Sequence, residues 1–247
     1  MRSRTMLLIL AMATPLTEYA QTIINRSIPV KSGQTIQMHF DYPKLIRVTS
    51  WDKNEISIQG HVSINAGEND DAFVLENSLQ GNIIKVDSEI RDLKNLPQRI
   101  TVTSDGQKMM FRDKEAYNKY RAEQGRNFSS MSWGPDIEID LEVKVPRNVH
   151  TEITSVYGMV EVKDFTGPLN VDATYGGIDA ALLERAVGEL TAQTNYGQIY
   201  SNLDIKFAGG QITTKDFYMQ VSARPGSGPK YNFESRYGNV YLRKAGN

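Results

Sequence analysis

The residues that could do chemistry in this chain are few and lie far apart in the sequence. The three histidines, His39, His61 and His150, show none of the His-x-His or His-x-x-x-His spacings that place two metal ligands on one element. The chain has no cysteine, so a thiolate nucleophile, a disulfide and a cysteine-bound metal are excluded. Neither a Gly-x-Ser-x-Gly elbow nor a phosphate-binding loop occurs. We therefore expect no catalytic, metal-binding or cofactor-binding residues.

Carboxylates on one face of a predicted strand are a second possible source of chemistry. From Ile137 to Val145, apolar residues alternate strictly with polar ones, which predicts a half-buried strand. Its polar face carries Glu138, Asp140 and Glu142. Carboxylate oxygens bind Ca²⁺, but the exposed face of an ordinary soluble strand has the same composition. We expect a solvated face rather than a calcium site.

Acidic residues also recur at a fixed distance from tyrosines. Glu161 and Asp179 each follow a Tyr by four residues, and they could lie side by side like the paired carboxylates of glycan-cleaving enzymes. Tyr200, Ser222 and Tyr241 occupy the same position after other tyrosines, so the row is not an acid cluster. A polysaccharide-cleaving enzyme is therefore the weaker hypothesis, and Tyr200 and Tyr241 become candidates for a binding surface.

The most regular pattern in the chain is a Tyr-Gly dipeptide with an apolar residue three positions after the Tyr. Tyr218, followed by Met219, supplies a degenerate copy, and successive tyrosines are then about 20 residues apart. A fixed period of this size is typical of stacked repeats. We therefore predict an all-β fold, a β-solenoid or β-helix of short strands with a short helical insertion. The four intact copies are Tyr157-Gly158, Tyr175-Gly176, Tyr196-Gly197 and Tyr237-Gly238.

Alternation before each Tyr suggests where its ring points. Ile153 lies four residues before Tyr157, and residues four apart in a strand share a face. We therefore expect the rings in the core, stacked about 4.8 Å apart, with a small residue two positions earlier leaving room. The alternation slips by one residue at the Gly, which predicts a bend or bulge. With this placement, Tyr196→Ala would cost roughly 3–5 kcal/mol. The competing hypothesis is an exposed aromatic ladder that stacks on sugar rings.

The first 20 residues differ from the rest. Arg2 and Arg4 precede the apolar run from Met6 to Ala13, and Ala20 offers a cleavage site, so residues 1–20 are expected to be a signal peptide. No later stretch is long and apolar enough to span a bilayer, so we predict no transmembrane segment in the mature chain. A net charge of −1 gives no electrostatic reason to expect nucleic-acid binding.

The mature chain divides by sequence texture into three regions. Residues 22–104 are rich in β-branched residues and form an N-terminal β region. Residues 136–247 form the repeat region, which we expect to continue the N-terminal β region. Residues 105–135 form a polar insertion between the two.

The insertion contains the only helical pattern that we identify. Residues 112–125 contain good helix formers, and Gly125 is placed to end the helix. Long insertions are either functional or disordered. The aromatic residues of the insertion that we include as candidates for a binding surface are Tyr117, Tyr120 and Trp133.

Three features together resemble the bacterial "putative adhesin" domain family. They are the Tyr-Gly repeats, the segment VKVPRN (143–148) at their start, and the segment RVTSWDKNEISIQG (47–60). This family is similar to auto-transporter adhesin head domains, and the likeness covers about residues 30–247 apart from the insertion. The resemblance implies an exported β-solenoid of the bacterial envelope and carries over no catalytic residue. The helical insertion and the degenerate copy DFYM (216–219) depart from the family pattern.

These observations favour an exported, non-enzymatic, adhesin-like binding module of the bacterial cell envelope. Its partner would be an envelope polysaccharide or protein, and its location the periplasm, the cell surface or the medium. The alternative is a periplasmic structural or sensory protein that binds a protein partner through residues 105–135. The sequence leaves the identity of the ligand and the oligomeric state open.

Overall fold

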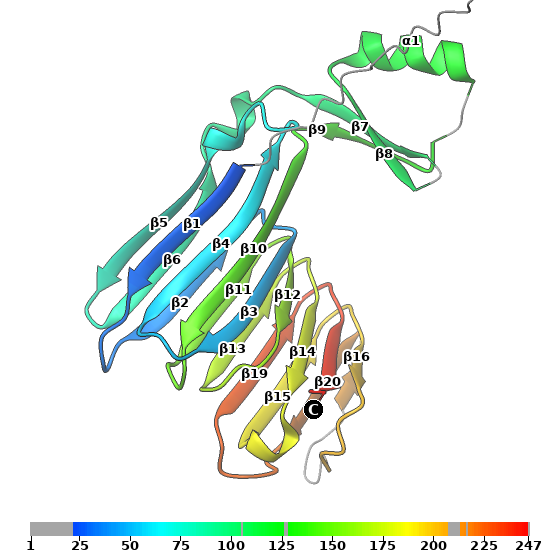
Figure 1. The fold of residues 1–247 in the computed structure, drawn as a ribbon. Coiled ribbons are helices and arrows are strands. Elements are labelled where there is room, and N and C mark those ends of the chain that lie inside the picture. The colour runs from blue at the N-terminus through cyan, green and yellow to red at the C-terminus, as the bar shows by residue number, and fades with distance from the viewer. Residues whose placement is uncertain (1–21, 105, 126–127, 207–212, 216, 247) are drawn as a thin grey trace, which may run out of the picture.

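The computed structural model describes residues 22–104, 106–125, 128–206, 213–215 and 217–246. It shows a protein built mostly of strands (Figure 1), which confirms the all-β class. The predicted signal peptide lies outside the described residues. Within the part of the chain that the structure describes, no helix is long and apolar enough to cross a membrane.

Two large sheets lie face to face and enclose one hydrophobic core (Figure 1). Sheet A contains, in spatial order, β1 (Thr22–Pro29), β4 (Glu55–Ile64), β10 (Ile137–Pro146), β3 (Leu45–Trp51), β12 (Met159–Val162), β14 (Ile178–Leu182), β20 (Val240–Lys244) and β16 (Ile199–Ser201). Sheet B contains β17 (Thr213–Lys215), β18 (Tyr218–Ala223), β15 (Glu189–Thr194), β19 (Lys230–Ser235), β13 (Leu169–Ala173), β11 (Thr151–Ser155), β2 (Thr35–Phe40), β6 (Ile83–Ile90) and β5 (Phe73–Gln80).

Alternating sequences explain how the central strands of the sandwich bury one face. In β10, Ile139, Leu141 and Val143 are at most 1% exposed, whereas Glu138 and Glu142 lie on the solvent side. Burial of such side chains is the main favourable term in folding, about 1.5–3 kcal/mol for each large aliphatic residue. The strict alternation from Ile137 onward is therefore a half-buried strand, as the sequence predicts.

The prediction of a β-solenoid is wrong. In a solenoid, consecutive turns of the chain are spatial neighbours. Here β19 and β20 insert between the pair β13–β14 and the pair β15–β16, so the last strands of the chain lie inside both sheets. The pairs β1–β4, β4–β10, β5–β6 and β15–β18 are antiparallel. The fold is a sandwich of two sheets with mixed strand directions.

A third sheet and the helix form a lobe that projects from one end of the sandwich (Figure 1). Its strands are β7 (Arg99–Ser104) in the centre, with β8 (Gln107–Phe111) and β9 (Ser130–Gly134) on either side. Helix α1 (Lys114–Gln124) begins after Asp113, whose side chain accepts a hydrogen bond from the Ala116 N–H, and ends at Gly125 with φ 58°. The helix lies where the sequence predicts it. The lobe, however, begins before residue 105, because β7 belongs to its sheet.

Ion pairs tie the lobe to the sandwich. Lys108 Nζ on β8 lies 2.7 Å from Asp136 Oδ1, just before β10, and 2.6 Å from Glu138 Oε1 on β10. Partial burial acts to lower the pKa of Lys108, but its hydrogen bonds to the two carboxylates outweigh burial and raise it. The hydrogen bond from Lys108 lowers the pKa of Glu138. Arg99, which is 6% exposed, pairs with Glu68 at 2.5 Å. These three contacts therefore help to hold the lobe in place.

Candidate binding surface: a ladder of aromatic corners

Each Tyr-Gly dipeptide lies at a corner where the chain passes from sheet B to sheet A. The sheet-B strands β11, β13, β15 and β19 all end two residues before the Tyr, and the following sheet-A strand begins two or three residues after it. The Tyr therefore belongs to neither strand. The alternation of buried and exposed side chains ends before the Tyr, so it does not determine which way the tyrosine ring points.

The tyrosine rings point outward, so the expected core placement is wrong. The exposed fractions of Tyr157, Tyr175, Tyr196 and Tyr237 are 57%, 55%, 60% and 48%. The small residue two positions earlier is fully buried instead, at 0% exposure. These buried residues are Ser155, Ala173, Thr194 and Ser235.

The buried hydroxyls fix the corners rather than making room for the rings. Thr194 Oγ1 accepts a hydrogen bond from the Gly197 N–H at 3.0 Å and donates one to the Gly238 carbonyl at 2.9 Å. Ser235 Oγ accepts from the Gly238 N–H and donates to the Gly176 carbonyl, both at 2.9 Å. Each of these hydroxyls links its own corner to the neighbouring one.

Glycine is required at these corners because the backbones approach closely. A Cβ on Gly176 would lie 1.9 Å from the Gly158 carbonyl oxygen, and one on Gly238 would lie 2.1 Å from the Gly176 carbonyl oxygen. A Cβ on Gly197 would lie 2.0 Å from the Gly238 carbonyl oxygen. None of these glycines adopts a positive φ. Of the two roles that the sequence allows for the Gly, close approach is the one that the structure uses.

The four rings stack in one continuous ladder. Ring centroids are 5.3 Å apart for Tyr157 and Tyr175, 5.1 Å for Tyr175 and Tyr237, and 5.1 Å for Tyr237 and Tyr196, with interplanar angles of 7–9°. The predicted stacking is confirmed, with Tyr237 between Tyr175 and Tyr196. The backbone supports it, because each Tyr N–H donates to the carbonyl of the residue before the neighbouring Tyr, as Tyr175 does to Val156 at 2.8 Å.

Two further aromatic residues, which the sequence did not reveal, extend the ladder. Tyr42 stacks on Tyr157 at 5.8 Å, and Phe217 stacks on Tyr196 at 6.0 Å. Partial burial, followed by the charge of Asp41, raises the pKa of Tyr42. We call this row the aromatic ladder. In spatial order it contains Tyr42, Tyr157, Tyr175, Tyr237, Tyr196 and Phe217.

Tyr218 does not form a fifth corner. It begins β18, which runs antiparallel to β15 and pairs with β17, so the chain forms a hairpin at this point. The Tyr218 hydroxyl donates to Gln193 Oε1 at 3.1 Å, and Met219 Sδ accepts a hydrogen bond from the Ile199 N–H at 3.3 Å. The neighbouring Phe217, which is 77% exposed, stacks on the ladder in its place.

The outer row on sheet A forms as the sequence spacing indicates, except that Ser222 lies on β18 in sheet B. The strand registers place Glu161 beside Asp179, Asp179 beside Tyr241 and Tyr241 beside Tyr200. The rings of Tyr200 and Tyr241 stack at 5.2 Å. Both carboxylates of the row are paired, because Arg47 lies 3.3 Å from Glu161 and Arg243 lies 2.6 Å from Asp179.

The aromatic candidates in the lobe do not join this row. Tyr117 and Tyr120 are partly buried, and their rings lie 5.7 and 5.2 Å from the ring of Phe111 on β8, so they hold α1 against the sheet. Trp133 on β9 is 60% exposed. The candidates from sequence thus fall on two surfaces, one on sheet A and one on the lobe.

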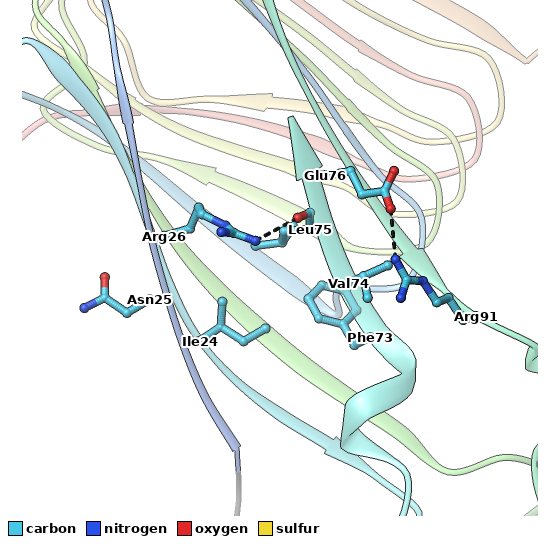
Figure 2. A pocket seen from close by; sticks show the side chains of 8 residues that line it. All are labelled: Ile24, Asn25, Arg26, Phe73, Val74, Leu75, Glu76 and Arg91. Carbon is cyan, nitrogen blue, oxygen red and sulfur yellow. Dashed lines mark hydrogen bonds and ion pairs between the residues drawn. The ribbon is translucent and has the colours of Figure 1, made fainter. Parts of the chain in front are cut away.

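A cavity of ≈ 530 Å³ lies between the edge strands β1 and β5 (Figure 2). Ile24, Phe73 and Leu75 supply its apolar lining. Arg26 donates to the Leu75 carbonyl at 3.3 Å, and Arg91 donates to a carboxylate oxygen of Glu76 at 3.0 Å. Both guanidinium groups are therefore engaged within the protein, and we do not select this cavity as the functional site.

The histidines remain separate from one another. His39 contacts Asp41 at 2.7 Å, and His150 contacts Glu152 at 3.4 Å. Over the described ranges of the chain, no group of three His, Asp or Glu side chains could hold a metal ion.

Comparisons with known proteins give weak structural likenesses only. No family model and no curated protein matches the chain. A crystal structure of a putative cell adhesion protein from Clostridium sporogenes aligns with 91% of this chain and 100% of its own, at 8% identity and a TM-score of 0.48. A putative adhesin from Bacteroides fragilis aligns with 92% of this chain and 98% of its own, at 12% identity and a TM-score of 0.31.

Proposed function

We propose that this chain is an exported, non-enzymatic, adhesin-like binding module of the bacterial cell envelope that holds an extended polysaccharide along the aromatic ladder. The observation that carries the proposal is the ladder itself. It aligns six aromatic residues, five from corners and Phe217 from the β17–β18 hairpin, and its four central tyrosines are 48–60% exposed. Contiguous exposed apolar surface on a soluble domain commonly marks a binding site, and tyrosine is enriched at interfaces.

The geometry of the ladder restricts what can bind. Neighbouring rings cover one another's faces at 5.1–5.3 Å, so a sugar cannot stack on a face inside the row. A ligand meets ring edges and phenol hydroxyls instead. These groups recur at a step similar to the length of one sugar in an extended glycan. A hydroxyl-rich polymer lying along the row could therefore exchange a hydrogen bond with successive tyrosines.

The proposal is tested by removing the hydroxyls while keeping the rings. The triple variant Tyr157→Phe, Tyr175→Phe, Tyr237→Phe retains the stacking, so its melting temperature should match that of the wild type. Three lost hydrogen bonds at about 0.5–1.5 kcal/mol each should weaken binding to insoluble cellulose, chitin or peptidoglycan by about tenfold or more. The matched control is Tyr200→Phe, Tyr241→Phe, which should bind like the wild type. If none of the three polymers retains the wild-type chain, or if both variants bind equally, the ladder is not the glycan surface.

The non-enzymatic part of the proposal is supported by the state of the carboxylates. Glu161 and Asp179 lie side by side in the outer row, but each is engaged by an arginine. The same incubations with polysaccharide should release no soluble sugar. Release of product would overturn this part, and Glu161→Gln and Asp179→Asn would then be the first substitutions to make.

Export is supported by the basic and apolar pattern of residues 1–20. Protease treatment of intact cells, followed by immunoblotting, tests the location. Cleavage of this chain while a periplasmic control survives would place the ladder at the cell surface. Protection until the outer envelope is opened would restrict the ligand to a periplasmic polymer. Retention of the chain in the cytoplasm would contradict export.

A further inference from the structure

The edge strand β9 of the lobe is unusually open to pairing. Its sequence, Ser-Met-Ser-Trp-Gly, contains no charged residue and no proline. Among the described strands it pairs with β7 alone. Met131 and Trp133 are each 60% exposed. The lobe projects from one end of the sandwich, and β9 leads from it into β10 of sheet A (Figure 1).

Met131 and Trp133 continue an apolar face that is buried elsewhere in the lobe. Opposed residues of paired strands share a face. The register places Trp133 opposite Ile100 and Met131 opposite Val102 on β7. Ile100 and Val102 are 2% and 0% exposed. Phe111 of β8, also opposite Ile100, is covered by the aromatic residues that anchor α1. The half of the face that β9 contributes is therefore left open.

Most other edge strands of this protein carry the charges that natural sheets use against unwanted pairing, and the three-residue strand β16, Ile-Tyr-Ser, is an exception. Strand β8, the opposite edge of the lobe sheet, contains Lys108. Strands β1 and β5, at one edge of each large sheet, contain Arg26 and Glu76. Strand β9 contains no such residue. Among the described edge strands, β9 is therefore the longest that has no charged residue.

We propose that β9 pairs antiparallel with β9 of a second copy of this chain, about a two-fold axis at Ser132. In this register Met131 faces Trp133 of the second copy, and Trp133 faces Met131 of the second copy, so two sulfur–aromatic contacts form. Ser132 faces itself. An uncharged strand brings no like charges together when it meets its own copy. The two three-stranded sheets become one six-stranded sheet with a continuous apolar face.

The interface is small, which determines how the association should behave. Stable specific interfaces bury about 1,200–2,000 Å² in total, and two five-residue strands with two large side chains each provide less. The dimer should therefore be weak and depend on concentration. Two linked sandwiches would present two aromatic ladders, so even a weak dimer would strengthen attachment to a polymer through multivalency.

The residue on the proposed axis gives a sharp test. Ser132 is exposed, so Ser132→Lys and Ser132→Glu should fold like the wild type. Each variant alone places two like charges opposite one another and should remain monomeric. An equal mixture places Lys opposite Glu and should dimerise again. Sedimentation velocity over a concentration series should show a rising average mass for the wild type and for the mixture only.

A matched change elsewhere separates this edge from general effects of charge. Ser78 is exposed on the edge strand β5, and Ser78→Lys should associate like the wild type. A wild-type chain that stays monomeric at every accessible concentration overturns the proposal. So does association of Ser132→Lys at wild-type strength, or failure of the mixture to dimerise while both variants keep the wild-type melting temperature. If either variant unfolds, Met131→Lys, which faces Trp133 of the second copy, should likewise abolish association.

Discussion

Replacement of Gly176 by alanine should separate two corners of the sandwich that are in direct backbone contact. The added Cβ would lie 1.9 Å from the Gly158 carbonyl oxygen, 2.4 Å from its carbon and 3.0 Å from the Met159 nitrogen. All three atoms belong to the backbone, so no change of rotamer relieves the clash. The corners at Gly158 and Gly176 must therefore move apart, although a hydrogen bond from the Tyr175 N–H to the Val156 carbonyl, at 2.8 Å, joins them.

The expected cost has two parts. Overpacking of a well-packed site costs about 1–3 kcal/mol. Loss of one or two backbone hydrogen bonds adds about 0.5–1.5 kcal/mol each. A total of about 3 kcal/mol should lower the melting temperature by roughly 6–12 °C in a chain of this size.

Thermal unfolding followed by circular dichroism measures this effect. The matched control is Gly246→Ala, because a Cβ on Gly246 has no neighbour within 4 Å and its φ is not positive. The control should melt within about 1 °C of the wild type, since surface substitutions are usually nearly neutral. If Gly176→Ala melts with the control, the close approach of the corners does not exist in solution.

Three further outcomes follow from the same geometry. Tyr196→Ala should lower the free energy of unfolding, measured by chemical denaturation, by only about 1–2 kcal/mol, because it removes ring stacking and leaves no buried cavity. A loss of about 4 kcal/mol or more would indicate that the ring is buried in the core. Thr194→Val should cost about 1–3 kcal/mol by leaving the Gly197 N–H unpaired, whereas a wild-type unfolding midpoint would show that the hydroxyl does not fix the corner. Glu138→Gln should lower the melting temperature at neutral pH, and the difference should vanish once the pH lies below the pKa of Glu138 in the folded state. The reason is that Lys108 lowers the pKa of Glu138 in the folded state, so the stability it adds is lost as the pH falls through that lowered pKa. A difference that persists at low pH would contradict this assignment.

Local patterns predicted local structure well. The alternation from Ile137 to Val145 gave a half-buried strand, because a strand has only two faces and one of them is buried. The helix predicted for residues 112–125 spans Lys114–Gln124, since a capping aspartate and a left-handed glycine terminate it. These signals depend on neighbours in the sequence and need no tertiary information.

The alternation of apolar and polar residues could not predict which way the tyrosine rings point. Ser155 and Tyr157 are two residues apart, and in a continuous strand they would share a face. The strand ends at Ser155, however, and the corner turns the ring outward. The close approach of Gly158 to the Pro43 carbonyl oxygen and the hydrogen bond from the Tyr157 N–H to the Asp41 carbonyl help to fix this turn. Both contacts join segments more than a hundred residues apart.

The order of the strands was equally hidden. Ile178, Val240 and Ile199 occupy equivalent positions in neighbouring strands, so each would fit beside any of the others. Because these strands present equivalent apolar faces, their sequences do not determine which strand lies beside which in the sheet. Tyr42 was missed for a related reason, because Pro43 replaces the glycine that marks the other corners. In hindsight, the Asp-Tyr-Pro segment immediately before β3 was the available signal.

The most direct test of the proposed ladder function is nuclear magnetic resonance on a chain with ¹³C-labelled tyrosine. The labelled chain is titrated with soluble fragments of whichever polysaccharide retains the wild type. Resonances of Tyr157, Tyr175, Tyr196 and Tyr237 should shift together and saturate, while those of Tyr200 and Tyr241 stay in place. Binding that shifts Tyr200 and Tyr241 and leaves the ladder resonances unchanged would contradict the account.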